Sequence, residues 1–228
     1  MVKRLEDYAP GARALILTAE RLFGEHGLNG VSLRQILAAA GQANSSAVQH
    51  HFGSKTGLIT AAYQTREQIL EVARAATLAA LDAQQLSSLK FLMRAWLMPI
   101  LEVFTEEERM VYARFMLQLL PLDTNDHPYF KTLQFSPASV ELTRRIKGSL
   151  PDLPSIVFNT RLRLSVSLFL EGVRNEGRVL AIRTDAYDSV TRYWNEIFQI
   201  ALAALTCPYP PVQTLPEDDN ADGLSLLT

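Results

Sequence analysis

The sequence predicts an all-α protein with a small N-terminal helix-turn-helix head and a larger helical body. Apolar residues recur at helical spacing through most of the chain up to residue 206. Glycine and proline residues stand where these runs end or begin, and no segment shows the alternation of a β-strand. We expect the head at residues 1–54, the body at 55–206, and a Pro-rich acidic tail, disordered or draped on the surface, at 207–228.

The first helix of the head is expected from Ala12 to Gly27. Its inner side carries apolar residues at helical spacing, and Gly27 can take the backbone conformation that ends a helix. These apolar residues are Leu15, Ile16, Ala19, Leu22 and Phe23.

Two shorter helices follow within residues 31–58. Ser32 can cap the first one while Gln35 reaches back to it, and Gly41 ends it. Asn44 can cap the second helix, which places small polar residues on one arc and Ala47, Val48 and Phe52 on the other. The polar arc consists of Ser45, Ser46, Gln49 and His50. Such a face suits a helix that enters the major groove, although it could also be the solvated surface of an ordinary bundle helix.

Four runs of head residues carry a resemblance to a known family. They are Ala19 to Phe23 with Gly27, Val31 to Ile36, Ala40-Gly41, and His51-Phe52-Gly53-Ser54-Lys55 leading to Leu58. Together they resemble the TetR family of transcriptional regulators over roughly residues 10–60. Beyond residue 60 only the helical architecture is similar, so the resemblance implies a DNA-binding head and leaves the ligand of the body open.

The resemblance also implies which residues contact DNA. Counted back from Phe52, it places the polar arc toward the bases and His51 and Lys55 at phosphates, with Arg34 in reach of a base edge. One extra residue between Gly41 and His51 leaves two possible registers. Alternatives stay open for Asn44 as a cap, for His51 as a packed histidine, and for Arg34 as a salt-bridge partner. The candidate DNA contacts are Arg34, Asn44, Ser45, Ser46, Gln49, His50, His51 and Lys55.

The formal net charge of −2 hides an uneven distribution along the chain. Residues 1–60 hold six Lys and Arg against four Asp and Glu, the middle of the chain is balanced, and residues 212–228 hold four acids. A mildly basic head predicts salt-sensitive phosphate binding that depends on pairing two heads in a dimer.

The body is expected to begin with a connecting helix from Ser54 to about Gln84, with an apolar row along one side. That row is Leu58, Ala62, Ile69, Val72, Ala76 and Ala80. Further helices are expected at 88–104 with a kink at Pro99, 105–119 with a Thr105–Glu108 capping box, 137–148 with Ser136 as cap, 154–175 and 185–205. Residues 121–135 are expected to form the main internal loop.

The last two helices are apolar on more than one side, which favours a four-helix interface between two subunits. The resemblance to TetR regulators implies the same homodimer. The expected interface residues are Phe158, Leu162, Phe169, Val190, Trp194, Ile197 and Ala201. The alternative is a pair of helices buried within a monomer.

A ligand cavity is expected between the connecting helix and this pair. Its candidate lining is Trp96, Met98, Phe104, Met110, Tyr112, Phe115 and Met116, with Arg94, Arg114, His127 and Tyr129 as polar candidates. Aromatic and methionine residues at helical spacing also make plain core, so this alternative stays open.

Several functional classes are disfavoured. The single cysteine, Cys207, forms no internal disulfide, and we expect no metal site, no cofactor and no catalytic constellation. No apolar run is long enough for a membrane span, and a cytoplasmic protein is expected.

The sequence therefore predicts a transcriptional regulator that binds double-stranded operator DNA. We expect a repressor that a small apolar or amphipathic effector releases. The alternative is a helical protein that sequesters a small molecule and carries a vestigial DNA-binding head.

Overall fold

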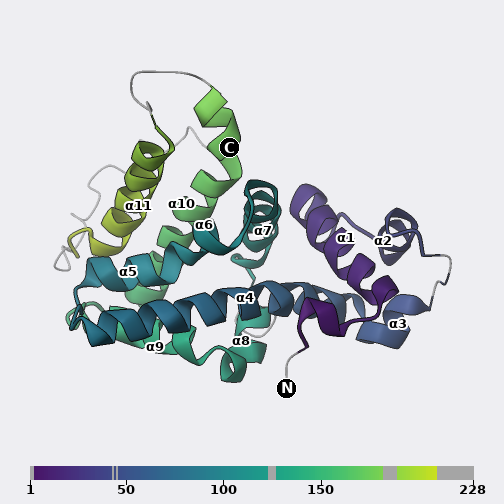
Figure 1. The fold of residues 1–228 in the computed structure, drawn as a ribbon, viewed down its shortest axis with the longest axis horizontal. Helices are drawn as coiled ribbons and strands as arrows, with labels where there is room; N and C mark the ends of the chain where they lie inside the picture. The colour runs from purple at the N-terminus through teal and green to yellow at the C-terminus, as the bar shows by residue number, and fades with distance from the viewer. Residues whose placement is uncertain (1–2, 43, 45, 123–126, 182–188, 210–228) are drawn as a thin grey trace, which may run out of the picture.

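The structure, a computed structural model, describes residues 3–42, 44, 46–122, 127–181 and 189–209. Across these residues the regular elements are all helices, which confirms the all-α prediction (Figure 1). No described helix is both long enough and apolar enough to cross a membrane.

The head contains a short 3-10 turn and three helices. Pro10 occupies the first turn of α1, and Gly27 ends this helix with a φ of 78°. The head elements are η1 (Leu5–Asp7), α1 (Pro10–His26), α2 (Leu33–Ala39) and α3 (Ala47–Phe52).

The body is built on α4 (Lys55–Ala83), whose N-terminus is capped by the Ser54 hydroxyl. Pro99 separates two helices where a kink was expected, because it cannot donate the helical hydrogen bond. The remaining elements are α5 (Leu89–Leu97), α6 (Pro99–Val103), α7 (Glu106–Leu119), α8 (Pro128–Thr132), η2 (Leu133–Phe135), α9 (Pro137–Gly148), α10 (Ser155–Ala181) and α11 (Val190–Thr206).

The long helix α4 runs from the head to the far end of the body (Figure 1). Helices α5, α6, α8 and α9 pack along it, and α10 packs against α11 and α7. Helix α7 also packs against α1, so the head contacts the body through both α4 and α7. Movement of either helix can therefore reach the head.

The buried side of α4 differs from the apolar row expected from the sequence. Leu58 and Ala62 are buried, but Ile69 is exposed and Val72 is 70% exposed. The buried side instead includes charged residues, namely Arg66, Glu67 and Arg74. These charges are paired, and pairing is what allows a charge to be buried.

One of these pairs fastens α4 to α9 and α5. Arg74 donates to the Glu67 carboxylate at 2.7 Å, to the Ser139 hydroxyl at 3.0 Å and to the Trp96 carbonyl oxygen at 3.1 Å. The Glu71 carboxylate accepts hydrogen bonds from the backbone amides of Ala138 and Ser139. It thus caps α9, where a Ser136 side-chain cap was expected and is not formed.

The expected loop at residues 121–135 contains two short helical elements, α8 and η2. His127 precedes α8, and its Nδ1 atom accepts a hydrogen bond from the Tyr129 amide at 3.0 Å. Pro128 occupies the first helical position, where its missing N–H costs nothing. The His127 ring lies edge-on to Tyr63 of α4 at 6.0 Å, so this segment is packed onto the body.

The bounds of the last two helices differ from the prediction. Helix α10 continues to Ala181, beyond the expected end at residue 175. Helix α11 begins at Val190 with Ser189 as its cap, whereas the expected start, Asp185, lies outside the described residues. Of the expected tail, Cys207, Pro208 and Tyr209 are described and exposed.

The buried histidine predicts a pH dependence of stability. Burial lowers the pKa of His127 to about 4, against 6.5 for a free histidine. As the pH falls from 6.5 to about 4, the unfolded chain gains a proton that the folded chain does not. This contribution to stability is therefore complete above pH 6.5, is lost on acidification, and amounts to at most about 3 kcal/mol.

Urea unfolding at pH 7, 5 and 4 checks this expectation. The His127→Asn variant keeps a capping acceptor and removes the titrating group. Its free energy of unfolding should fall less with acidification than that of the wild type. Parallel pH profiles for the two proteins would contradict the assignment.

Candidate nucleic-acid interface

Local features set both ends of α2. The Ser32 hydroxyl accepts from the Gln35 amide at 3.3 Å, and the Gln35 side chain accepts from the Ser32 amide at 2.8 Å. This is the expected capping box. Gly41 follows α2 with a φ of 66°, a conformation that glycine adopts without steric cost.

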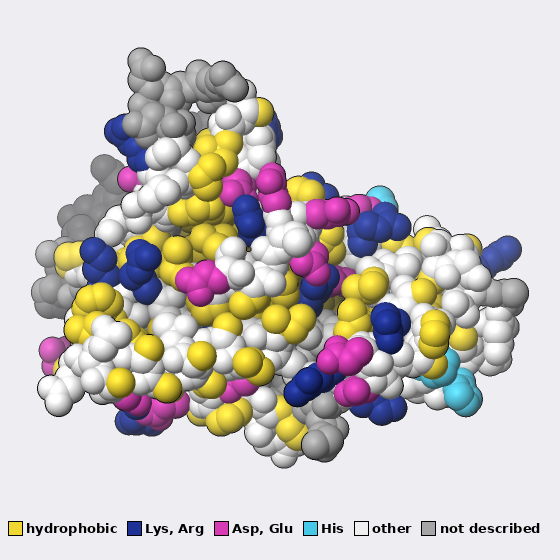
Figure 2. Space-filling view, viewed as in Figure 1, with side chains coloured by type: hydrophobic (Ala, Val, Ile, Leu, Met, Phe, Trp, Pro, Cys, Tyr) yellow, Lys and Arg dark blue, Asp and Glu magenta, His cyan; other side chains and the backbone are white. Residues whose placement is uncertain are grey.

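Helix α3 presents polar residues outward and apolar residues inward. Ala47 and Val48 are buried, and Phe52 lies 6.0 Å from the ring of Tyr8. Gln49 and His50 are exposed, and Figure 2 shows histidine side chains at the surface over this end of the head. The arrangement is that of a short helix docked by one face with the other free for a partner.

The described residues just before α3 settle how this helix begins. Ser46 occupies the cap position, and its amide donates to the Asn44 side-chain oxygen at 2.9 Å. Asn44 thus forms a turn with Ser46, and the helix cap lies two positions after Asn44, the residue expected to provide it. Both residues are exposed, whereas Ser45 lies outside the described residues.

The alternatives that were open for two other candidates are not seen in the structure. Arg34 is exposed on α2 and forms no ion pair with any described residue, so its alternative as a salt-bridge partner is not seen. His51 is exposed, with its ring 4.7 Å from that of His50 and 5.9 Å from that of Phe52. It is therefore not a packed interior histidine.

Lys55 has a structural contact in addition to the predicted contact with phosphate. Its Nζ atom donates to the Val31 carbonyl oxygen and lies 5.5 Å from the centre of the Phe23 ring. The side chain is half-buried and ties the start of α4 to the segment before α2. One ammonium proton is used in this contact, and two are left for other partners.

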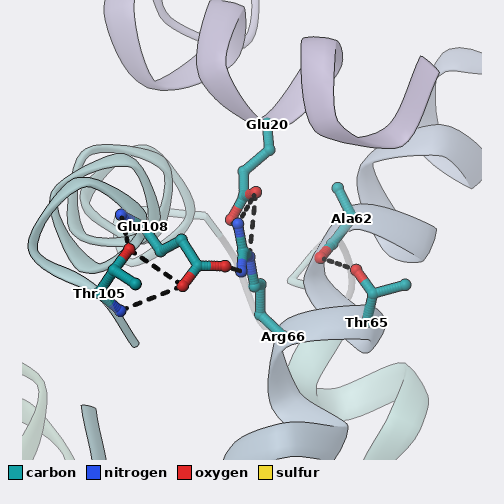
Figure 3. A network of polar contacts seen from close by, with 6 residues as sticks. All are labelled: Glu20, Ala62, Thr65, Arg66, Thr105 and Glu108. Atoms are coloured by element: carbon teal, nitrogen blue, oxygen red, sulfur yellow. Dashed lines mark hydrogen bonds and ion pairs between the residues drawn. The ribbon is translucent and has the colours of Figure 1, made fainter. Parts of the chain in front are cut away.

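A buried ion pair joins the head to the body (Figure 3). The Arg66 guanidinium on α4 donates to the Glu20 carboxylate on α1, with Nε–Oε1 and Nη2–Oε2 distances of 2.9 and 3.0 Å. It also donates to Glu108 on α7 at 3.2 Å. Glu108 in turn closes the expected capping box with Thr105. One side chain thus holds three helices.

Electrostatics in this cluster follow from burial and pairing. Burial raises the pKa of Glu20, and the Arg66 charge opposes this effect. Burial acts to lower the pKa of Arg66, but the charge and hydrogen bonds of Glu20 outweigh it, so this pKa is raised. The guanidinium therefore stays charged at every pH at which the protein is folded.

Close packing accompanies the ion pair. A Cβ atom added at Gly24 of α1 would lie 2.9 Å from the Cβ atom of Arg114 on α7, so only glycine fits there. The rings of Phe23 and Phe115 stack across the same two helices at 6.4 Å. The head is therefore seated on α7 by direct backbone and ring contact.

The expected ligand residues lie within or beside the core of the body. Phe104, Tyr112, Phe115 and Met116 are buried, whereas Trp96, Met98 and Met110 are half-buried. Phe104 lies 5.4 Å from Tyr112, and the Arg66 guanidinium lies 5.1 Å from the Phe104 ring. Phe115 faces the head. Of the polar candidates, Arg94 lies over Phe198, 5.4 Å from its ring centre.

Most of the expected dimer residues lie inside their own chain. Phe158, Leu162, Phe169, Trp194 and Ala201 are buried in the core of their own chain, because α10 and α11 pack these faces against each other and the body. Ile197 is half-buried, and a Cβ atom at Gly172 would lie 2.5 Å from its Cγ2 atom. Of the expected set only Val190 is exposed, and it is joined at the surface by Leu164, Leu168 and Ile200.

Comparison with known proteins identifies a family match for the head. Residues 15–62 match the family model described as bacterial regulatory proteins, tetR family. No curated protein matches the chain in sequence. A solved structure entitled "Crystal structure of superantigen pfit" is 17% identical and covers 86% of this chain and 87% of its own, with a TM-score of 0.32.

The head geometry and the matched residues define the class of protein. A capped helix, a glycine turn and a second helix with an outward polar face form a helix-turn-helix DNA-binding domain. Residues 15–62 therefore carry the N-terminal helix-turn-helix DNA-binding domain that the tetR family model describes, which supports a TetR-family transcriptional regulator.

Gly53 provides a test of the geometry at the end of α3. Its φ of 71° closes this helix, and an added Cβ atom would meet no atom within 4 Å. The Gly53→Ala variant should therefore lose about 1 kcal/mol of stability from backbone strain alone. Urea unfolding measures this loss, with Gly148→Ala as control because Gly148 lies in a helix with open space around it. Equal stability of Gly53→Ala and the wild type would contradict the turn geometry.

Proposed function

We propose that the protein is a homodimeric repressor that leaves its operator when a small apolar or amphipathic molecule binds to its body. The observation that carries the DNA-binding part is the outward polar face of α3, held by the buried residues Ala47 and Val48. As a bacterial regulator it would act in the cytoplasm, where its DNA lies. We also propose the division of the chain near residue 54, with no enzymatic activity in either part.

The base contacts of this proposal are Arg34, Gln49 and His50, with Asn44, Ser45 and Ser46 at the start of the recognition helix. Arg34 supports the proposal because it is exposed and has no ion-pair partner among the described residues. An unpaired guanidinium can bind guanine through two hydrogen bonds. His51 and Lys55 stay as proposed phosphate contacts.

The dimer of this proposal uses the outer side of α10 and α11. Leu164 and Leu168 are four residues apart on α10, so they share one helix face, and both are exposed. Figure 2 shows apolar side chains gathered over this helix pair. A second subunit that covers this face would supply the second head that two operator half-sites require.

The ligand part of the proposal rests on how the body is linked to the head. The buried cluster of Glu67, Arg74 and Ser139 places polar groups beside Trp96 in an otherwise apolar region, which is typical of small-molecule sites. Phe104 from the expected lining contacts Arg66, which binds the head. A ligand that displaces Phe104 or Tyr112 would therefore disturb the contact that orients α1.

The alternative of a sequestering protein with a vestigial head is not favoured. The match to the tetR family model spans residues 15–62, which covers most of α1, all of α2 and α3, and the start of α4. Specific binding to operator DNA is expected of the regulator and not of a sequestering protein.

Removal of the Arg34 guanidinium should weaken specific DNA binding. The Arg34→Ala variant should lose about 10- to 100-fold in affinity for the DNA upstream of its gene, because a bidentate base contact contributes about 1–3 kcal/mol. A gel shift across a salt series with unrelated DNA as competitor measures this affinity. The control is Arg163→Gln, an exposed arginine on α10. Equal binding by Arg34→Ala and wild type would exclude the proposed contact.

Charges placed on the outer face of α10 should separate the subunits. In the Leu164→Arg/Leu168→Arg variant, two exposed apolar residues become charged without any change to the core. We expect a dimer mass for the wild type and a monomer mass for this variant at micromolar concentration by light scattering. Val72→Arg, on the exposed side of α4, should stay dimeric. A monomeric wild type would refute the dimer.

A further inference from the structure

An open depression with a volume of about 460 Å³ lies where the head meets the body. Three arginines line it, together with residues of α1. The lining consists of Gly24, Glu25, Arg114, Arg174, Asn175 and Arg178. None of these residues belongs to the proposed DNA-binding surface.

The positive charge of the depression is not balanced by its surroundings. Glu25 is the single acid among its described lining residues, and Arg21 already binds that carboxylate at 3.2 Å. Arg174 binds Glu171 at 2.7 Å. Arg114 and Arg178 form no hydrogen bond or ion pair with a described residue, although Arg114 is half-buried against α1. Two guanidinium groups without an acidic partner give the depression a positive charge, which favours an anionic ligand.

We propose that this depression binds a small oxyanion with at least two negatively charged oxygens, either a phosphate or a carboxylate compound. Guanidinium groups bind both kinds of oxyanion through paired, charge-assisted hydrogen bonds. Arginines from α7 and α10, which are far apart in the sequence, lie together in this depression, as charged residues do in preformed ligand sites. The volume falls within the range of small-molecule sites, roughly 300–1,000 Å³.

The phosphates of an operator bound to α3 are not the ligand of this site. Tyr8, just before α1, contacts Phe52 of α3, whereas the depression lies at the other end of α1. From Gly11 to Glu25 the helix rises about 21 Å at 1.5 Å per residue. Figure 1 shows the same separation, with α3 away from the point where α1 meets α7. The ligand is therefore a free small molecule.

Equilibrium dialysis of the full-length protein tests this site without reference to DNA binding. The probes are radiolabelled inorganic phosphate and radiolabelled citrate, each at constant ionic strength with chloride as the other anion. We expect saturable binding of at least one probe at one site per chain. Arg114→Gln and Arg178→Gln should each weaken it by at least about 10-fold, because each removes charged hydrogen-bond donors.

The matched control is Arg163→Gln, which removes an exposed arginine from another part of α10 and should leave binding unchanged. Saturable phosphate binding assigns the phosphate class, and binding of citrate alone assigns the carboxylate class; either result supports the site. Arg178 is exposed, so its variant keeps the test decisive even where Arg114→Gln fails to fold. No saturable binding of either probe, or equal binding by wild type and Arg178→Gln, would overturn the proposal.

Discussion

The arrangement of the head on the body depends on the buried guanidinium of Arg66. It lies where α1, α4 and α7 meet, and it is bound by Glu20 from the head and Glu108 from the body. Arg66 is 7% exposed and Glu20 is 1% exposed, so loss of either partner would leave a charge in a site with little water. An unpaired buried charge costs several kcal/mol, so any orientation of the head that separates Glu20 from Arg66 is strongly disfavoured.

The same contact gives the body a route to the DNA-binding helices. Glu108 stabilises the start of α7 through its capping box with Thr105. Phe104 directly precedes Thr105, and its ring lies against the Arg66 guanidinium. A change in the body that shifts the start of α7 or the Phe104 ring therefore changes the surroundings of Arg66. Arg66 lies on α4, and α4 is joined directly to α3 through Gly53 and Ser54. A shift of α4 would therefore displace both α3 and the Arg66 contact with α1.

Local motifs were predictable from the sequence, whereas the contacts between distant segments were not. The capping boxes at Ser32 and Thr105 involve residues three positions apart, so their pattern is visible in the chain itself. The buried side of α4 was missed because Arg66 and Arg74 look like surface residues until their partners are known. Glu20 and Glu108 lie 46 and 42 positions from Arg66, and Ser139 lies 65 positions from Arg74. The dimer interface stays a prediction for a related reason, because apolar periodicity does not say which partner covers a face.

A double-mutant cycle of Glu20→Gln and Arg66→Met, read by urea unfolding, tests the central role of this ion pair most directly. The account predicts a coupling energy of about 2 kcal/mol or more, because each single change leaves a buried polar group unpaired. The exposed pair Arg144–Glu141 serves as reference and should couple by less than about 1 kcal/mol. A coupling energy below about 0.5 kcal/mol for Glu20 and Arg66 would contradict the account.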